Sequence, residues 1–96
     1  MNILFMVSTP GAGEILSQMV RACQRKGVSW GVFFTNDGVK VVSHDAVKDL
    51  LHCAGEAFVC EHSWQREMQD MPCPVGLGSQ TQNSMLAGKA EHIISL

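Results

Sequence analysis

Hydrophobic residues fall into short apolar runs that alternate with helical stripes. Ile3–Val7 is a continuous apolar run that ends at a Pro-Gly turn, a pattern typical of a parallel strand covered on both faces. Apolar residues then recur at offsets 0, 1, 4, 5 and 8, which predicts a helix with one hydrophobic face; they are Ile15, Leu16, Met19, Val20 and Cys23. Gly27 is a helix-stop signal.

The middle of the chain repeats this alternation. Residues 29–34 form a second hydrophobic, aromatic-rich run, and the turn sequence 36–38 (Asn-Asp-Gly) follows at once. Ser43 is placed to cap a short helix over residues 46–51. Residues 57–60 then predict a third strand.

The last third predicts one more helix–strand unit. Residues 61–69 are compatible with a helix, whereas the prolines at 72 and 74 predict a connecting loop. Ser79 is expected to cap a final helix, and residues 92–96 to form the last strand. A further brief strand is expected near Val75.

The order βαβαβαβ predicts one α/β domain over residues 1–96, because parallel neighbouring strands need crossover connections. The expected sheet has helices on its faces. Chemistry in such sheets gathers at the carboxyl ends of the strands, which here are residues 8–13, 35–39 and 60–62.

Composition narrows the class of partner. Hydrophobic residues make up 46% and charged residues only 17%, so we expect part of the surface to be buried in an oligomer. A net charge of −2 gives no broad cationic field, which disfavours direct binding of nucleic acid or of a membrane surface. The first apolar run lacks a basic leader and is far too short for a membrane span, so a cytoplasmic protein is expected.

Four cysteines without an export signal suggest reduced thiols rather than a disulfide framework. Cys23 lies on the first helical stripe and is read as core, and Cys53 as helix packing. Cys73, between two prolines, is the alternative reactive thiol and a partner with which Cys60 could exchange.

Cys60 stands where the third strand ends and a helix begins, and free helix amides at such a position favour a thiolate. His62 would add support if charged, whereas Glu61 would oppose it. The alternative is that Cys60 is simply the last buried residue of an apolar strand.

Metal and nucleotide sites are less well supported. Cys53, Cys60, His62 and Cys73 contain no Cys-x-x-Cys pair, so we expect neither a metal site nor a cofactor. The loop 11–14 carries two glycines but has Leu16 where a dinucleotide fingerprint needs glycine. A tight strand-to-helix turn is therefore favoured over a phosphate site.

Several segments resemble the DsrE/DsrF and TusC/TusD family of small sulfur-relay proteins. The most specific is the Phe-Phe-x-x-Asp-Gly-Val stretch within residues 32–39; the cysteine segment 59–64 and the closing segments 76–79 and 93–96 are also similar. The resemblance implies a DsrE/YchN-like, flavodoxin-related three-layer sandwich with a four- to five-stranded, mostly parallel sheet. Residues 61–64 are bulkier than is usual in the family, and the chain is shorter between its second and third strands.

The resemblance places Cys60 on the family's sulfur-carrying cysteine. It implies a sulfur carrier, a possible sulfurtransferase, that accepts sulfane sulfur as a persulfide and passes it to a partner protein in tRNA thiolation or sulfur oxidation. Asn36, Asp37 and Gly38 would shape the mouth of this site, with Asp37 as a turn former. Dimers, trimers or hexamers are expected. Two alternatives stay open: a non-catalytic structural subunit, and a small-ligand or nucleotide-binding module using residues 11–14.

Overall fold

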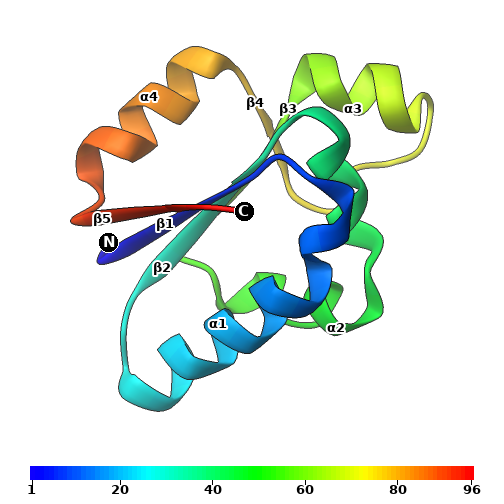
Figure 1. The fold of residues 1–96 in the computed structure, drawn as a ribbon. Helices are drawn as coiled ribbons and strands as arrows, with labels where there is room; N and C mark the ends of the chain where they lie inside the picture. Colours follow the sequence, from blue (N-terminus) through cyan, green and yellow to red (C-terminus); the bar gives the residue numbers. More distant parts are fainter.

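The computed structural model describes all residues 1–96. Strands and helices alternate along the chain as the hydrophobic pattern predicts (Figure 1). In order, the elements are β1 (Ile3–Val7), the 3₁₀ turn η1 (Pro10–Ala12), α1 (Gly13–Lys26), β2 (Trp30–Phe34), η2 (Asn36–Ser43), α2 (Asp45–Lys48), η3 (Leu51–Cys53), β3 (Glu56–Cys60), α3 (Glu61–Met68), β4 (Gly76–Gly78), α4 (Gln80–Lys89) and β5 (His92–Ser95).

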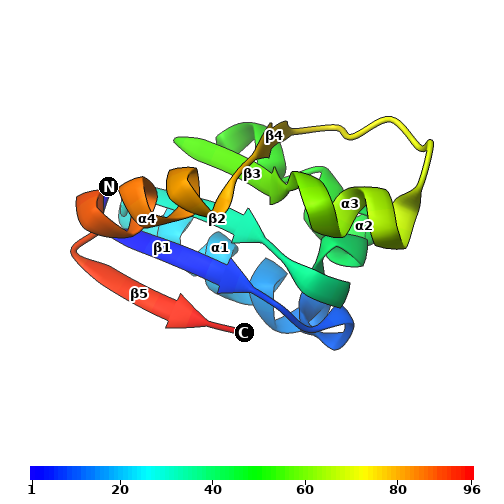
Figure 2. The ribbon, with the colours of Figure 1, turned by 90° about the horizontal axis from the view of Figure 1, so that it is seen from above.

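The five strands form one parallel sheet in the order β4-β3-β2-β1-β5. The chain adds strands in one direction from β1 to β4 and then returns to place β5 beside β1. Because parallel crossovers are right-handed, this reversal puts the connection through α4 on the face opposite α1, α2 and α3. Figures 1 and 2 show α4 separated from α1 and α2 by the sheet. The predicted three-layer α/β sandwich is confirmed.

Side chains of the strands alternate between two cores of unequal size. All five residues of β2 are buried: Trp30, Val32 and Phe34 belong to a cluster of sixteen buried residues on the α1 side. Phe33 points the other way, into a cluster of four buried residues beneath α4. The second face of the sheet therefore has a much thinner cover.

The second connection differs from the expected turn and helix. Residues 36–43 continue as 3₁₀ helix, and Val39 and Val42, three residues apart, are both buried because this spacing aligns side chains in a 3₁₀ helix. The prediction that Ser43 caps the following helix is wrong. His44 is the N-cap, and its Nδ1 atom accepts a hydrogen bond from the Ala46 amide at 3.2 Å.

The other predicted boundaries hold more closely. Gly27 ends α1 with a φ of 66°, a left-handed conformation that glycine adopts without steric cost. Ser79 caps α4, and its side chain accepts from the Gln82 amide. The brief strand expected near Val75 is β4, a three-residue edge strand paired with β3. None of the helices has both the length and the apolar character needed to cross a bilayer.

Candidate functional site

The reversal of the chain creates a switch point between β3 and β4. The helix after β3 packs with Trp64 on the larger core, whereas the helix after β4 packs with Leu86 on the smaller one. The two helices therefore leave neighbouring strand ends toward opposite faces of the sheet. Crevices at such points, outside the carboxyl ends of the strands, are where open α/β sheets bind ligands.

Cys60 lies at this switch point. It is the last residue of β3 and the N-cap of α3, and it pairs in register with Gly78 of β4. Its side chain is only 6% exposed and belongs to the small cluster with Leu4, Phe33 and Leu86. The structure thus confirms the predicted strand-to-helix position of Cys60 and also shows that its sulfur is buried on the α4 side of the sheet.

Polar groups from both flanking helices surround the sulfur. The Gln80 side chain, in the first turn of α4, donates from Nε2 to Cys60 Sγ at 3.6 Å. The thiol makes no N-cap hydrogen bond, but the His62 and Ser63 amides at the start of α3 interact favourably with the charged sulfur. Anionic sulfur is therefore stabilised by amides at the start of α3 and by one side chain from the first turn of α4.

These contacts shift the balance between thiol and thiolate. Burial raises the pKa of Cys60, because a buried thiolate loses hydration. Nearby polar groups that favour the charged sulfur outweigh this effect and hold the pKa of Cys60 below its usual value; they are the Ser63 hydroxyl and amide, the Gln80 side chain and the His62 amide. Cys60 therefore exists as a thiolate at lower pH than an ordinary cysteine.

Ser63 contacts both the Cys60 sulfur and the segment that follows β2. Ser63 is only 3% exposed, and its hydroxyl accepts a hydrogen bond from the Asn36 amide at 2.9 Å. Asn36 has a φ of 52°, a left-handed conformation that asparagine tolerates. The predicted supporting residue Asn36 thus reaches Cys60 through its backbone and Ser63, not through its own carboxamide.

The other predicted supporting residues act differently. Gly38 is buried against the end of β1, where a Cβ would collide with the Val7 carbonyl oxygen. Asp37 and His62 are exposed, and the His62 ring makes no hydrogen bond to Cys60; only its backbone amide contributes. The His62 imidazole therefore gives Cys60 no support through a hydrogen bond in this arrangement.

Arg66 is a neighbouring charge that sequence reasoning missed. Its Nε donates to Glu67 at 2.9 Å, and this bond is the main cause of its raised pKa. The negative charges of Asp37 and of the Cys60 thiolate also raise it. Arg66 is exposed and lies about two turns along α3 from the cysteine. In the sequence it looks like an ordinary charged residue on the solvent face of a helix.

Replacing Ser63 by alanine is expected to raise the pH at which Cys60 becomes reactive. The change removes a hydroxyl that stabilises the thiolate, and it leaves the Asn36 amide without its partner at a cost of about 1 kcal/mol in unfolding free energy. The measurement is the pH dependence of Cys60 alkylation, followed by peptide mass spectrometry. Ser84→Ala, an exposed serine of α4, is the control, and an unchanged pH midpoint in Ser63→Ala would contradict this account.

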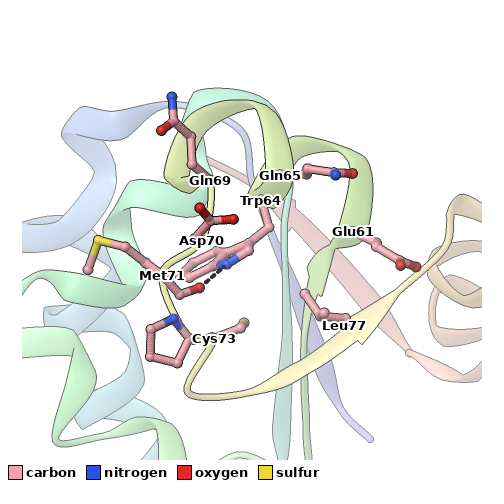
Figure 3. Close-up of a pocket in the computed structure, with 9 residues that line it drawn as sticks. Glu61, Trp64, Gln65, Gln69, Asp70, Met71, Cys73 and Leu77 are labelled. Carbon is pink, nitrogen blue, oxygen red and sulfur yellow. Dashed lines mark hydrogen bonds between the residues drawn. The ribbon is translucent and has the colours of Figure 1, made fainter.

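Cys73 occupies a different environment. It lines an open cavity of about 620 Å³ between α3, the following loop and β4, together with Trp64, Met71 and Leu77. Figure 3 shows the Trp64 indole nitrogen directed at the Met71 carbonyl oxygen, to which it donates at 2.7 Å. Burial raises the pKa of the Cys73 thiol, and the Val75 amide only partly offsets this.

The four cysteines are free, and the structure does not bring Cys60 and Cys73 together. Cys73 packs against the larger core, whereas Cys60 belongs to the cluster on the other face of the sheet. Cys23 is buried in the larger core as expected, and burial raises its pKa. Cys53 packs against the same core, with its sulfur 3.4 Å from His52 Nε2.

Neither the zinc nor the nucleotide interpretation gains a site. No three His, Cys, Asp or Glu side chains lie close enough together to hold a metal ion. In the loop 11–14, Gly13 is covered by the His44 ring, which a Cβ at this position would strike. Glu14 lies in the first turn of α1, where its carboxylate repels an anion.

Sequence reasoning could place Cys60 but not the side chain that meets its sulfur. Gln80 lies twenty residues away and reaches Cys60 only because β4 pairs beside β3. The single sequence signal was the Ser79 cap, which fixes where α4 starts.

No protein-family model, no curated protein and no solved structure matches this chain.

Proposed function

We propose that this chain is a sulfur carrier that accepts sulfane sulfur on Cys60 and passes it to a partner protein. The observation that carries the proposal is the convergence of hydrogen-bond donors from α3 and α4 on one sulfur at the switch point of the sheet. A stabilised thiolate is the form that attacks sulfur. The resemblance of residues 32–39 and 59–64 to the sulfur-relay family supports the same role.

The chemistry is an exchange between sulfur atoms without net oxidation. The Cys60 thiolate attacks the outer sulfur of a donor persulfide, R–S–SH; a new S–S bond forms, and the donor's S–S bond breaks to release R–S⁻. The product is Cys60–S–SH. An acceptor thiolate then attacks this outer sulfur and returns Cys60 as a thiolate, so the two steps need no cofactor.

The donor and acceptor are proposed to be proteins of a sulfur relay, serving either tRNA thiolation or sulfur oxidation. Incubation with a persulfide donor, followed by non-reducing peptide mass spectrometry, tests the carrier role. One added sulfur atom on the peptide that contains Cys60 is the expected result. A protein that gains sulfur on no cysteine contradicts the proposal.

A structural subunit is the second candidate function, because one observation favours it. Cys60 is only 6% exposed and packs with Leu4, Phe33 and Leu86, which suits inert packing as well as a protected nucleophile. The lowered pKa of Cys60 supports the carrier over the structural subunit, since burial alone raises the pKa of a cysteine.

We expect the protein to self-associate or to bind a paralogue through the α4 side of the sheet. This face is thinly covered, and Met85 of α4 and Ile93 of β5 are 61% and 47% exposed. Both faces of parallel sheets are normally covered. Light scattering at micromolar concentration should give a mass above the 10.5 kDa of one chain.

Met85→Glu should weaken this association, because it puts a charge into the proposed contact. Met71→Glu is the matched control, since Met71 is similarly exposed at 57% but lies in the loop after α3. A protein that stays monomeric and binds no sulfur-relay paralogue would exclude this interface.

A further inference from the structure

The Gln80 carboxamide makes a contact at each of its two ends. Its Nε2 donates to Cys60 Sγ at 3.6 Å, and its Oε1 accepts from Asn83 Nδ2 at 3.4 Å. A carboxamide has one donor end and one acceptor end. Turning it over would place an oxygen, which repels a thiolate, against the sulfur. The orientation of Gln80 therefore decides whether it stabilises thiolate or thiol.

Asn83 is one of the buried residues of α4. It is 9% exposed, and its amide donates to the Ser79 carbonyl oxygen at 3.0 Å in the first turn of the helix. Three residues separate it from Gln80, the spacing at which helix side chains meet. The side chain is thus held where its NH₂ group reaches the Gln80 oxygen.

Asn83 also carries an unsatisfied atom. Its Oδ1 is buried and has no hydrogen-bond partner, which lowers the stability of the fold. An apolar residue at this position under the helix would avoid that cost. The donor end of the same carboxamide, in contrast, is paired, and its one side-chain hydrogen bond goes to the Gln80 oxygen.

We propose that Asn83 is a positioning residue that holds the Gln80 carboxamide with its NH₂ group toward the Cys60 sulfur. The inference rests on the proposed role of Cys60 as a nucleophile. A thiolate accepts hydrogen bonds but donates none, so the ordered pair Asn83–Gln80 favours the charged sulfur. The same donor would face the sulfur after transfer, when Cys60 carries an anionic persulfide.

Charged groups near the sulfur come from other elements. On α3 they are Glu61, His62 and Arg66, and on η2 Asp37. The first turn of α4 has no acidic residue. The only basic residue of this helix, Lys89, lies at its far end and pairs with Glu56 at 3.6 Å. Substitutions at Gln80 and Asn83 therefore leave every one of these charges in place.

The experiment is a double-mutant cycle read as the pH dependence of Cys60 alkylation by iodoacetamide. Gln80→Leu, an exposed position, and Asn83→Leu are each expected to move the pH midpoint upward and to slow alkylation at neutral pH by up to about fivefold. Asn83→Leu should have no further effect in the Gln80→Leu background, because Asn83 acts through Gln80. Thermal unfolding confirms that each variant is folded.

An unchanged midpoint in Gln80→Leu would overturn the proposal, and so would an Asn83→Leu shift that persists fully in the double variant. If Asn83→Leu does not fold, Asn83→Ala replaces it in the cycle. The Gln80→Leu variant alone still tests whether the Gln80 side chain lowers the pH midpoint of Cys60 alkylation. Midpoint shifts without persulfide loading would support this inference while refuting the carrier function. Loading without midpoint shifts would do the reverse.

Discussion

Cys60→Ser is expected to abolish persulfide loading, whereas the wild-type chain gains one sulfur atom on the peptide that contains Cys60. Serine cannot form the S–S bond that retains the transferred sulfur. The fold should survive the change, because serine is close in size to cysteine and is a favoured N-cap residue, the position that Cys60 holds at the start of α3. Peptide mass spectrometry under non-reducing conditions gives the answer.

Cys73→Ser is the matched control and should load as well as the wild type. Burial raises the pKa of Cys73, so it offers less thiolate at neutral pH, and it packs on the other side of the sheet from Cys60. Circular dichroism of both variants checks that the fold is intact. Sulfur that accumulates on Cys73 or Cys53 in the wild-type chain, or on no cysteine, would refute the assignment and favour the structural subunit.

Much of the architecture could be predicted because the pattern of hydrophobic residues and stop signals over short stretches of sequence indicates strands and helices. The run Ile3–Val7 is continuous because β1 is an interior strand covered on both faces, and Gly27 ends α1 because the chain adopts a left-handed conformation there. The order β4-β3-β2-β1-β5 was not predictable from the same patterns. It depends on where α4 carries the chain after β4.

Errors arose where local signals competed. The sequence around Asn36 and Gly38 is typical of a simple turn. Burial of Val39 and Val42 in the core instead places the following residues in a 3₁₀ helix. Ser43 is the better N-cap by residue preference, yet the chain places His44 at that position, where the ring also covers Gly13. Tertiary packing overrode local preference in both places.

The candidate site also has one part that local sequence predicts and one part that it does not. The position of Cys60 was predictable, since the end of a strand and the start of a helix are both indicated by consecutive residues. Ser63 lies three residues from Cys60 and stabilises its thiolate directly, but the hydrogen bond that its hydroxyl accepts from the Asn36 amide could not be predicted from neighbouring residues. Gln80 and Asn83 required the pairing of β4 with β3, which no local signal contains. Tertiary contacts therefore supply the groups that tune the sulfur.

Gly38→Ala is expected to lower the unfolding free energy by about 3 kcal/mol, the upper range for forcing extra volume into a packed interior. The added Cβ would collide with the Val7 carbonyl oxygen and would lie 2.7 Å from the Val7 carbonyl carbon and 2.8 Å from Ser8 Cα. These are backbone atoms at the end of the interior strand β1, so they cannot yield as a flexible side chain can. Relief requires residues 36–38 to move away from the sheet.

That movement would also disturb the cysteine site, because the Asn36 amide donates to Ser63, which in turn stabilises the Cys60 thiolate. Urea unfolding measures the stability of Gly38→Ala, and alkylation of its folded fraction should show a pH midpoint above that of the wild type. Gly88→Ala is the matched control: nothing lies within 4 Å of a Cβ there, and in the helix α4 the change should raise stability by up to about 1 kcal/mol. Equal stability of the two variants would show that residue 38 has room for a side chain and that the close approach to Val7 does not hold this connection in place.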